Sequence, residues 1–214
     1  FIFSNNVICI SKSVSNSLPF YLNFCKKTIY NPINFKYLKK KVNIKKIFFL
    51  SNLIKNKGAD LVYELVKDKR FIYKILIIGK GFYKQKFKKL NKINIKFKNS
   101  ISNPNSIFNI NSIVFCPSRS EGFGRVVTEA IIANSTVIAS NILAHKEIKH
   151  YCMKKENLKL VEFENKKFFF NLIEKEILRR KIFHEENKLK KLTNQILHVK
   201  KIVNVYQSIW LEIK

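Results

Sequence analysis

Two glutamates and two glycines between residues 117 and 130 have the types and spacing of a ligand site. Glu121 lies in a short polar segment, and Glu129 follows eight positions later, one to two turns into an expected helix. Carboxylates accept paired hydrogen bonds from sugar diols. Gly122 and Gly124 let the backbone approach a ligand and turn its N–H groups toward it. Together with the positive end of the helix, those groups can form an anion site.

The same stretch also has a purely structural interpretation, in which the carboxylates only stabilise a helix N-terminus. The elements around it favour binding. A buried strand expected at Ile113–Cys116 brings the loop to the carboxyl edge of a sheet, where open α/β folds bind ligands.

Short apolar runs alternate with longer amphipathic segments along the chain, as a parallel sheet with crossover helices requires. We expect strands at residues 1–10, 47–50, 75–78, 93–97, 113–116 and 136–139. Helices are expected at 57–66, after Gly81 through Leu90, from Pro104, at 125–133 and over most of 166–214. The predicted class is therefore α/β, a parallel sheet flanked by helices, with a long helical C-terminus.

An Asn-Pro turn at Asn31-Pro32 and the lysine run Lys39–Lys41 predict a domain boundary near residues 35–43. This divides the chain into residues 1–40 and residues 41–214. The chain opens within an apolar run at Phe1, so we expect an upstream part to be missing.

The segment from Pro117 to Ala130 closely resembles the donor-site signature of the group 1 glycosyltransferases, family 4 of the GT-B fold. The resemblance spans nearly the whole chain and is strongest between residues 44 and 148. It implies a Rossmann-like domain, the C-terminal half of a GT-B fold, that binds a nucleotide-diphosphate sugar. It also implies that Glu121 contacts the transferred sugar and that Glu129 holds the nucleotide ribose.

A second match, residues 49–58, resembles the strand, basic loop and helix start of the same family. It implies that Lys57 neutralises the diphosphate as it leaves, since an ammonium there stabilises developing negative charge without a metal. Asn52 stands where many members carry an arginine. The lost positive charge would have to come from Lys55 or Arg125, or the activity is weak.

The resemblance implies two catalytic residues, Glu121 and Lys57. The donor-binding residues that it implies are Asn52, Gly79, Gly81, Gly122, Phe123, Gly124, Arg125, Val126 and Glu129. Neither a cofactor nor a metal is expected. The implied reaction transfers a sugar, with retention, to a polysaccharide or lipid-linked glycan. Residues 1–40 resemble the end of the acceptor domain and the interdomain segment, so the rest of that domain would have to come from elsewhere.

Departures from the family pattern leave the nucleotide open. Asn134-Ser135 replaces a usual glycine, and Lys98-Asn99 replaces another near the base pocket. The segment Gly79–Lys84 could be taken for a dinucleotide fingerprint, but Lys84 occupies the third glycine position, which argues against NAD. One alternative remains a catalytically incomplete fragment or non-catalytic subunit that keeps the donor-domain fold.

The 42 Lys and Arg against 14 Asp and Glu leave a formal charge of +28, which suggests phosphate-rich partners. The basic residues are mostly Lys, spread through a chain rich in Asn, Ile and Phe. All four types have A/T-rich codons, so genome bias explains the charge without nucleic-acid binding. We therefore expect no nucleic-acid partner. Peripheral contact with an anionic membrane remains open.

The four cysteines form no CxxC pair and the four histidines lack metal-ligand spacing, so neither a zinc site nor a disulfide framework is indicated. No apolar run approaches the length of a membrane span. We expect a cytoplasmic protein, and peripheral contact with the inner face of the membrane stays open as an alternative. His145 is expected in a loop after a strand, where a surface role is favoured over the alternative of lining the cleft.

Overall fold

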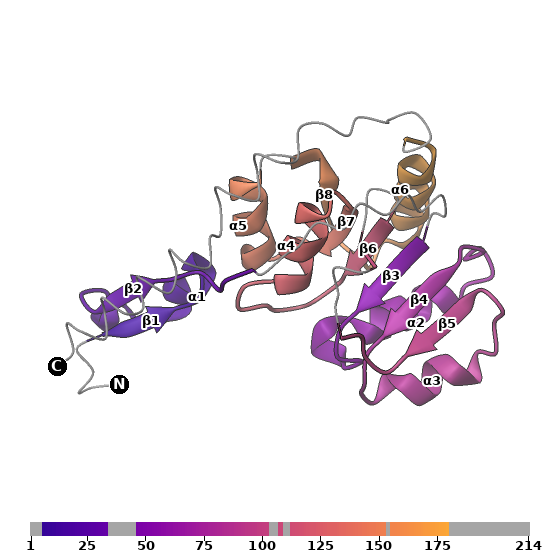
Figure 1. The fold of residues 1–214 in the computed structure, drawn as a ribbon, viewed down its shortest axis with the longest axis horizontal. Coiled ribbons are helices and arrows are strands. Elements are labelled where there is room, and N and C mark those ends of the chain that lie inside the picture. The colour runs from indigo at the N-terminus through magenta and orange to yellow at the C-terminus, as the bar shows by residue number, and fades with distance from the viewer. Residues whose placement is uncertain (1–5, 34–45, 103–106, 109–111, 153–154, 180–214) are drawn as a thin grey trace.

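The fold is built around a six-stranded parallel sheet. The computed structural model describes residues 6–33, 46–102, 107–108, 112–152 and 155–179. The strand order is β5-β4-β3-β6-β7-β8 (Figure 1). The strands are β3 (Lys46–Leu50), β4 (Ile75–Ile78), β5 (Ile95–Lys98), β6 (Ser112–Cys116), β7 (Thr136–Ser140) and β8 (Leu158–Val161). The expected α/β class is confirmed.

Helices cover both faces of this sheet because its central strands are apolar on both sides. Phe49 belongs to a core shared with α2 (Ala59–Lys67), α3 (Tyr83–Lys89) and α6 (Lys166–Arg179). Its neighbour Phe48 points to the opposite face. There it belongs to a second core, to which the helices α4 (Arg125–Ile132) and α5 (Leu143–Tyr151) contribute.

A small unit of residues 7–33 precedes the sheet. Its strands β1 (Val7–Cys9) and β2 (Lys26–Thr28) pair in parallel, with α1 (Lys12–Ser17) and a 3₁₀ turn at Phe20–Leu22 between them. Val7, Cys9, Leu22 and Cys25 form its own core. In Figure 1 this unit lies beside α5, at the far end from β5.

Several boundaries differ from those expected. α2 begins at Ala59 rather than Lys57, because Gly58 adopts a left-handed conformation (φ 71°) and ends a 3₁₀ turn. β5 begins two residues later than expected. Asn134 fills the place of the usual glycine with a positive φ of 61°, which asparagine tolerates better than most residues.

The surface position expected for His145 is wrong. The sequence pattern predicts no helix here, but His145 lies on α5 and is fully buried. β8 was not expected either.

The domain boundary at 35–43, the helix from Pro104 and the C-terminal segment after Arg179 lie outside the described residues. Within the described part of the chain, no helix is long and apolar enough to span a bilayer.

Candidate functional site

The sheet order creates a switch point between β3 and β6. From β3 the chain winds outward through β4 and β5, then returns to β6 and winds the other way. In open α/β sheets, ligands bind outside the carboxyl ends of the strands at this point. A cavity of about 640 Å³ lies there, lined by the carboxyl ends of β3, β4 and β6. Its volume falls within the usual range for a small-molecule site.

Most of the site residues implied by the sequence meet in this cavity. Those that line it are Asn52, Lys57, Gly79, Glu121, Gly122, Phe123, Gly124, Arg125 and Val126. Gly81 and Glu129 lie outside its lining. Of the two proposed substitutes for a missing arginine, Arg125 lines the cavity and Lys55 does not.

Lys57 and Glu121 form an ion pair in the cavity. The Lys57 Nζ lies 2.7 Å from Glu121 Oε2, and the two side chains are 24% and 20% exposed. Ser118 Oγ donates a hydrogen bond of 2.7 Å to the other carboxylate oxygen of Glu121. Both charges therefore lie within reach of a ligand and already neutralise each other.

The N-terminus of α4 opens onto the same cavity. Gly124 precedes the helix with a φ of 80°, and a Cβ there would lie 2.9 Å from Ile148 Cδ1 of α5. The first N–H groups of a helix have no intrahelical acceptor. Those of Arg125 and Val126 belong to residues that line the cavity, so this end can receive an anion.

Glu129 lies behind this helix end, one turn after Arg125. Its carboxylate Oε1 is 3.5 Å from an Arg125 nitrogen. Burial raises the pKa of Glu129, and the nearby Arg125 opposes that rise. A carboxylate with a raised pKa and little water around it gains from a ligand that donates hydrogen bonds.

His145, for which lining the cleft was the alternative, lies outside the cavity lining and packs against Gly124 instead. The ring Cδ2 lies 3.4 Å from where a Gly124 Cβ would stand. Its Nδ1 is 2.9 Å from the Ser140 carbonyl oxygen, and its buried Nε2 has no hydrogen-bond partner among the residues that the structure describes. Burial lowers the pKa of His145, which favours the neutral ring.

The 7–33 unit also reaches the cavity, through Ile10 and Asn31. Ser11 Oγ donates a hydrogen bond to the Gly122 carbonyl. The ring centroids of Tyr30 and Phe123 are 5.9 Å apart. The sequence could not reveal these contacts, because they join residues more than 90 positions apart.

A further wall comes from Lys80, Asn99 and Ser100. Lys84 Nζ donates a 2.6 Å hydrogen bond to Asn99 Oδ1, which fixes the amide that replaces the family glycine. Among the residues that the structure describes, no cluster of three or more His, Cys, Asp and Glu has the arrangement of a metal site.

Comparison with known proteins gives consistent matches. A family model described as "Glycosyl transferases group 1" matches residues 31–195. An uncharacterized glycosyltransferase of Methanocaldococcus jannaschii is 30% identical over 143 residues, 65% of this chain and 41% of the relative. The O-antigen biosynthesis glycosyltransferase WclY of Escherichia coli is 32% identical over 165 residues, 69% of this chain and 46% of the relative. The matched region thus spans less than half of either relative.

Solved structures share the fold at lower identity. TarM aligns with a TM-score of 0.74 and 19% identity, over 95% of this chain and 43% of TarM. Anabaena Alr3699/HepE, solved in complex with UDP, aligns with a TM-score of 0.73 and 15% identity, over 99% of this chain and 65% of that protein. A glycosyltransferase from Rickettsia africae aligns with a TM-score of 0.74 and 17% identity, over 98% of this chain and 63% of that one.

Proposed function

The chain belongs to the group 1 glycosyl transferases, and we propose that its cavity binds the nucleotide-diphosphate sugar from which the enzyme transfers a sugar. The observation that carries this proposal is the meeting of Lys57, Glu121 and the α4 N-terminus at the switch point of the sheet. A diphosphate needs cationic partners and a sugar needs hydroxyl acceptors, and this cavity offers both.

Each side chain has a proposed role that follows from its chemistry. Lys57 and the N-terminus of α4 take up the negative charge of the departing diphosphate, so transfer needs no resident metal. Glu121 orients the sugar through its hydroxyls. Lys57 and Glu121 form an ion pair before the donor binds. Donor binding therefore replaces this ion pair by contacts of each side chain with the ligand. Arg125 supplies the charge that Asn52 lacks.

Glu129 is proposed to bind the ribose. It lies outside the cavity lining but is paired with Arg125, which lines the cavity. UDP bound to a protein of this fold, Alr3699/HepE, supports a nucleoside diphosphate as the occupant.

The finer assignments are proposals that rest on the family resemblance: membership of family 4, transfer with retention, and a polysaccharide or lipid-linked glycan as the acceptor. The O-antigen relative supports the glycan acceptor. Residues 7–33 would form the edge of the acceptor half. We also propose a cytoplasmic site of action, at the inner face of the membrane.

The first experiment measures the melting temperature of the chain against UDP-, GDP- and ADP-sugars. We expect the sugars of one nucleotide to raise the melting temperature. At a ligand concentration of a hundred times Kd, binding adds about 2.7 kcal/mol to the free energy of unfolding. Glu129→Gln should abolish most of that rise, and Lys57→Ala should reduce it. Glu162→Gln, an exposed position, is the matched control and should respond like the wild type.

If no nucleotide sugar raises the melting temperature, donor binding is contradicted. That result would favour a non-catalytic subunit that keeps only the fold. An equal response of Glu129→Gln and wild type would contradict the ribose assignment alone.

A further inference from the structure

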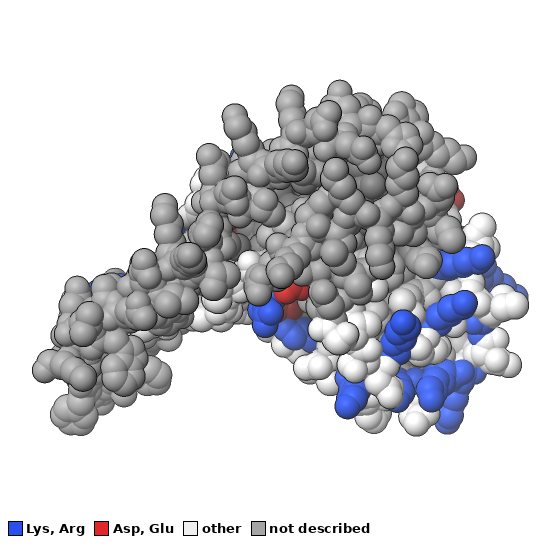
Figure 2. All heavy atoms as spheres, viewed as in Figure 1, with Lys and Arg blue, Asp and Glu red and all other residues white. Residues whose placement is uncertain are grey.

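The basic residues are not evenly spread in the folded chain. Residues 69–100 contain eleven Lys and Arg and no Asp or Glu, whereas the rest of the chain contains 31 Lys and Arg and all 14 acidic residues. This segment forms β4, α3 and β5, at one end of the sheet. In Figure 2 the lobe over α3 and β5 shows blue and white spheres without red.

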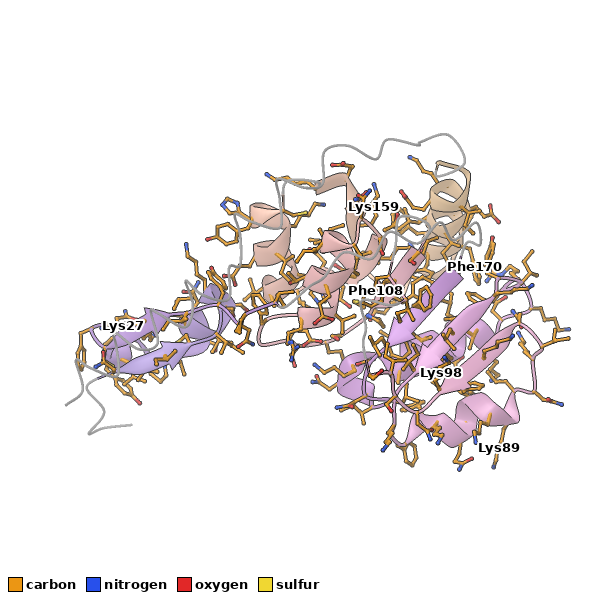
Figure 3. The ribbon with its side chains drawn as sticks, in the orientation of Figure 1. Lys27, Lys89, Lys98, Phe108, Lys159 and Phe170 are labelled. Atoms are coloured by element: carbon orange, nitrogen blue, oxygen red, sulfur yellow. The ribbon has the colours of Figure 1, made fainter. Side chains whose placement is uncertain are left out.

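α3 is attached to the sheet by one stripe and exposes another. Phe87 is buried in the core, and its ring packs against those of Tyr63 and Phe97. Spacings of four and three residues place Phe82, Lys86 and Lys89 along a separate, outward stripe. Figure 3 shows Lys89 on the outer side of the helix.

Two large exposed apolar side chains lie next to the two ends of this helix in the sequence. Phe82, just before the helix, is 73% exposed, and Ile93, just after it, is 99% exposed. Lys86 Nζ lies 5.1 Å from the centre of the Phe82 ring. We call Phe82, Lys86, Lys89 and Ile93 the α3 face.

We propose that the α3 face docks the protein onto a membrane surface of anionic phospholipids. Anionic lipid headgroups attract lysine ammonium groups near the surface, and each such lysine raises the membrane affinity by a factor of about five. Lysine stems extend along apolar material while their charges stay in water. Phe82 and Ile93 are placed to enter the boundary between headgroups and acyl chains, as apolar side chains of interfacial helices do.

Two alternative roles for these lysines account for only part of the pattern. Lysines on an edge strand prevent sheets from aggregating, which explains Lys96 and Lys98 of β5 but not the exposed Phe82 and Ile93. Nucleic-acid surfaces favour arginine. The one arginine of this segment, Arg70, is bridged to Asp68 at 2.7 Å and lies over the Phe170 ring. Lysine charge combined with exposed apolar side chains favours a lipid surface.

The α3 face does not line the donor cavity. Membrane docking and donor binding are therefore separable.

Co-sedimentation of the full chain with phosphatidylcholine vesicles, with and without phosphatidylserine, tests the proposal at physiological salt. We expect binding only to the anionic vesicles. Lys86→Glu/Lys89→Glu should weaken it at least about tenfold. Phe82→Ser/Ile93→Ser, which keeps every lysine, should also weaken it, because the apolar contacts are lost.

The matched control is Lys167→Glu/Lys175→Glu on α6, which changes the net charge equally at exposed positions. It should leave binding within about twofold of wild type. Equal losses in both charge-reversed variants would overturn the proposal in favour of unspecific attraction by net charge, and so would equal binding to neutral vesicles.

Gel shifts with duplex DNA and single-stranded RNA test the alternative that the α3 face binds nucleic acid. Nucleic-acid binding tighter than vesicle binding, and lost in Lys86→Glu/Lys89→Glu, would overturn the proposal in favour of a nucleic-acid surface. The donor-induced rise in melting temperature should persist in every α3 variant, which verifies folding and separates this test from that of the proposed function.

Discussion

At the residue scale, the charged groups in and beside the cavity lie in unequal environments. Lys57 and Glu121 are partly exposed and pair with each other, whereas Glu129 is only 9% exposed and, among the described residues, is paired with Arg125 at 3.5 Å. Desolvation disfavours a buried carboxylate. We therefore expect the ionised form of Glu129 to destabilise the ligand-free fold.

This imbalance predicts a pH-dependent effect of Glu129→Gln. The pKa of Glu129 is raised in the folded state, so protonation stabilises the fold and that stability is lost as pH rises through the raised pKa. At pH 7 the ligand-free variant should melt a few degrees higher than wild type. At pH 4, below the unfolded pKa of about 4.3, the difference should shrink toward zero.

Melting curves of both proteins at pH 7 and pH 4 measure this. Glu164→Gln, at an exposed position, serves as the control for the change in net charge. If the variant were less stable than wild type at pH 7, Glu129 would have a structural role instead.

At the element scale, the start of α2 determines where Lys57 lies. Gly58 is left-handed, and a Cβ there would lie 2.1 Å from the Pro117 carbonyl oxygen. This close approach brings the loop before α2 against the loop after β6. As a result, Lys57 meets Glu121.

We expect Gly58→Ala to destabilise the fold by at least about 2 kcal/mol, from backbone strain and the clash with Pro117. Gly122→Ala is the matched control. Its φ is not left-handed, and the nearest neighbours of its Cβ would be side-chain atoms, Ile10 Cδ1 at 3.0 Å and Val14 Cγ2 at 3.7 Å. The control should lose less than about 1 kcal/mol in urea unfolding. Equal losses would argue against this account of the loop.

At the scale of the whole molecule, one carboxylate joins the 7–33 unit to the sheet domain. Glu147 of α5 accepts hydrogen bonds from the Lys12 and Ser13 backbone N–H groups, at 2.9 and 2.8 Å. The Tyr30 hydroxyl donates a third, at 2.7 Å. Burial and Glu147 raise the pKa of Tyr30, so it stays protonated and can donate.

We expect Glu147→Ala to loosen the 7–33 unit. Hydrogen bonds to a charged group each contribute roughly 1.5–3 kcal/mol, so amides of β1, α1 and β2 should exchange at least about tenfold faster. Amides of β3, β6 and β7 should keep their wild-type rates. Hydrogen exchange of Glu162→Ala, at an exposed site, is the control. Unchanged exchange in the 7–33 unit would show that Glu147 does not hold it.

The sequence by itself determined the local features of this protein. Apolar runs predicted β3, β4 and β6 within one or two residues, because hydrophobic periodicity is a local property. The resemblance to the family's donor-site segments likewise named nine residues that line the cavity. Their proposed roles stay predictions.

Only the tertiary structure decided the rest. The ends of the strands meet through contacts between distant residues, which no local pattern encodes. This is why Ile10 and Asn31 joined the cavity unforeseen, why Glu129 lies behind its wall, and why His145 is buried. The acid-free, lysine-rich segment 69–100 can be read from the sequence, but only the fold places its strands side by side at the β5 end of the sheet.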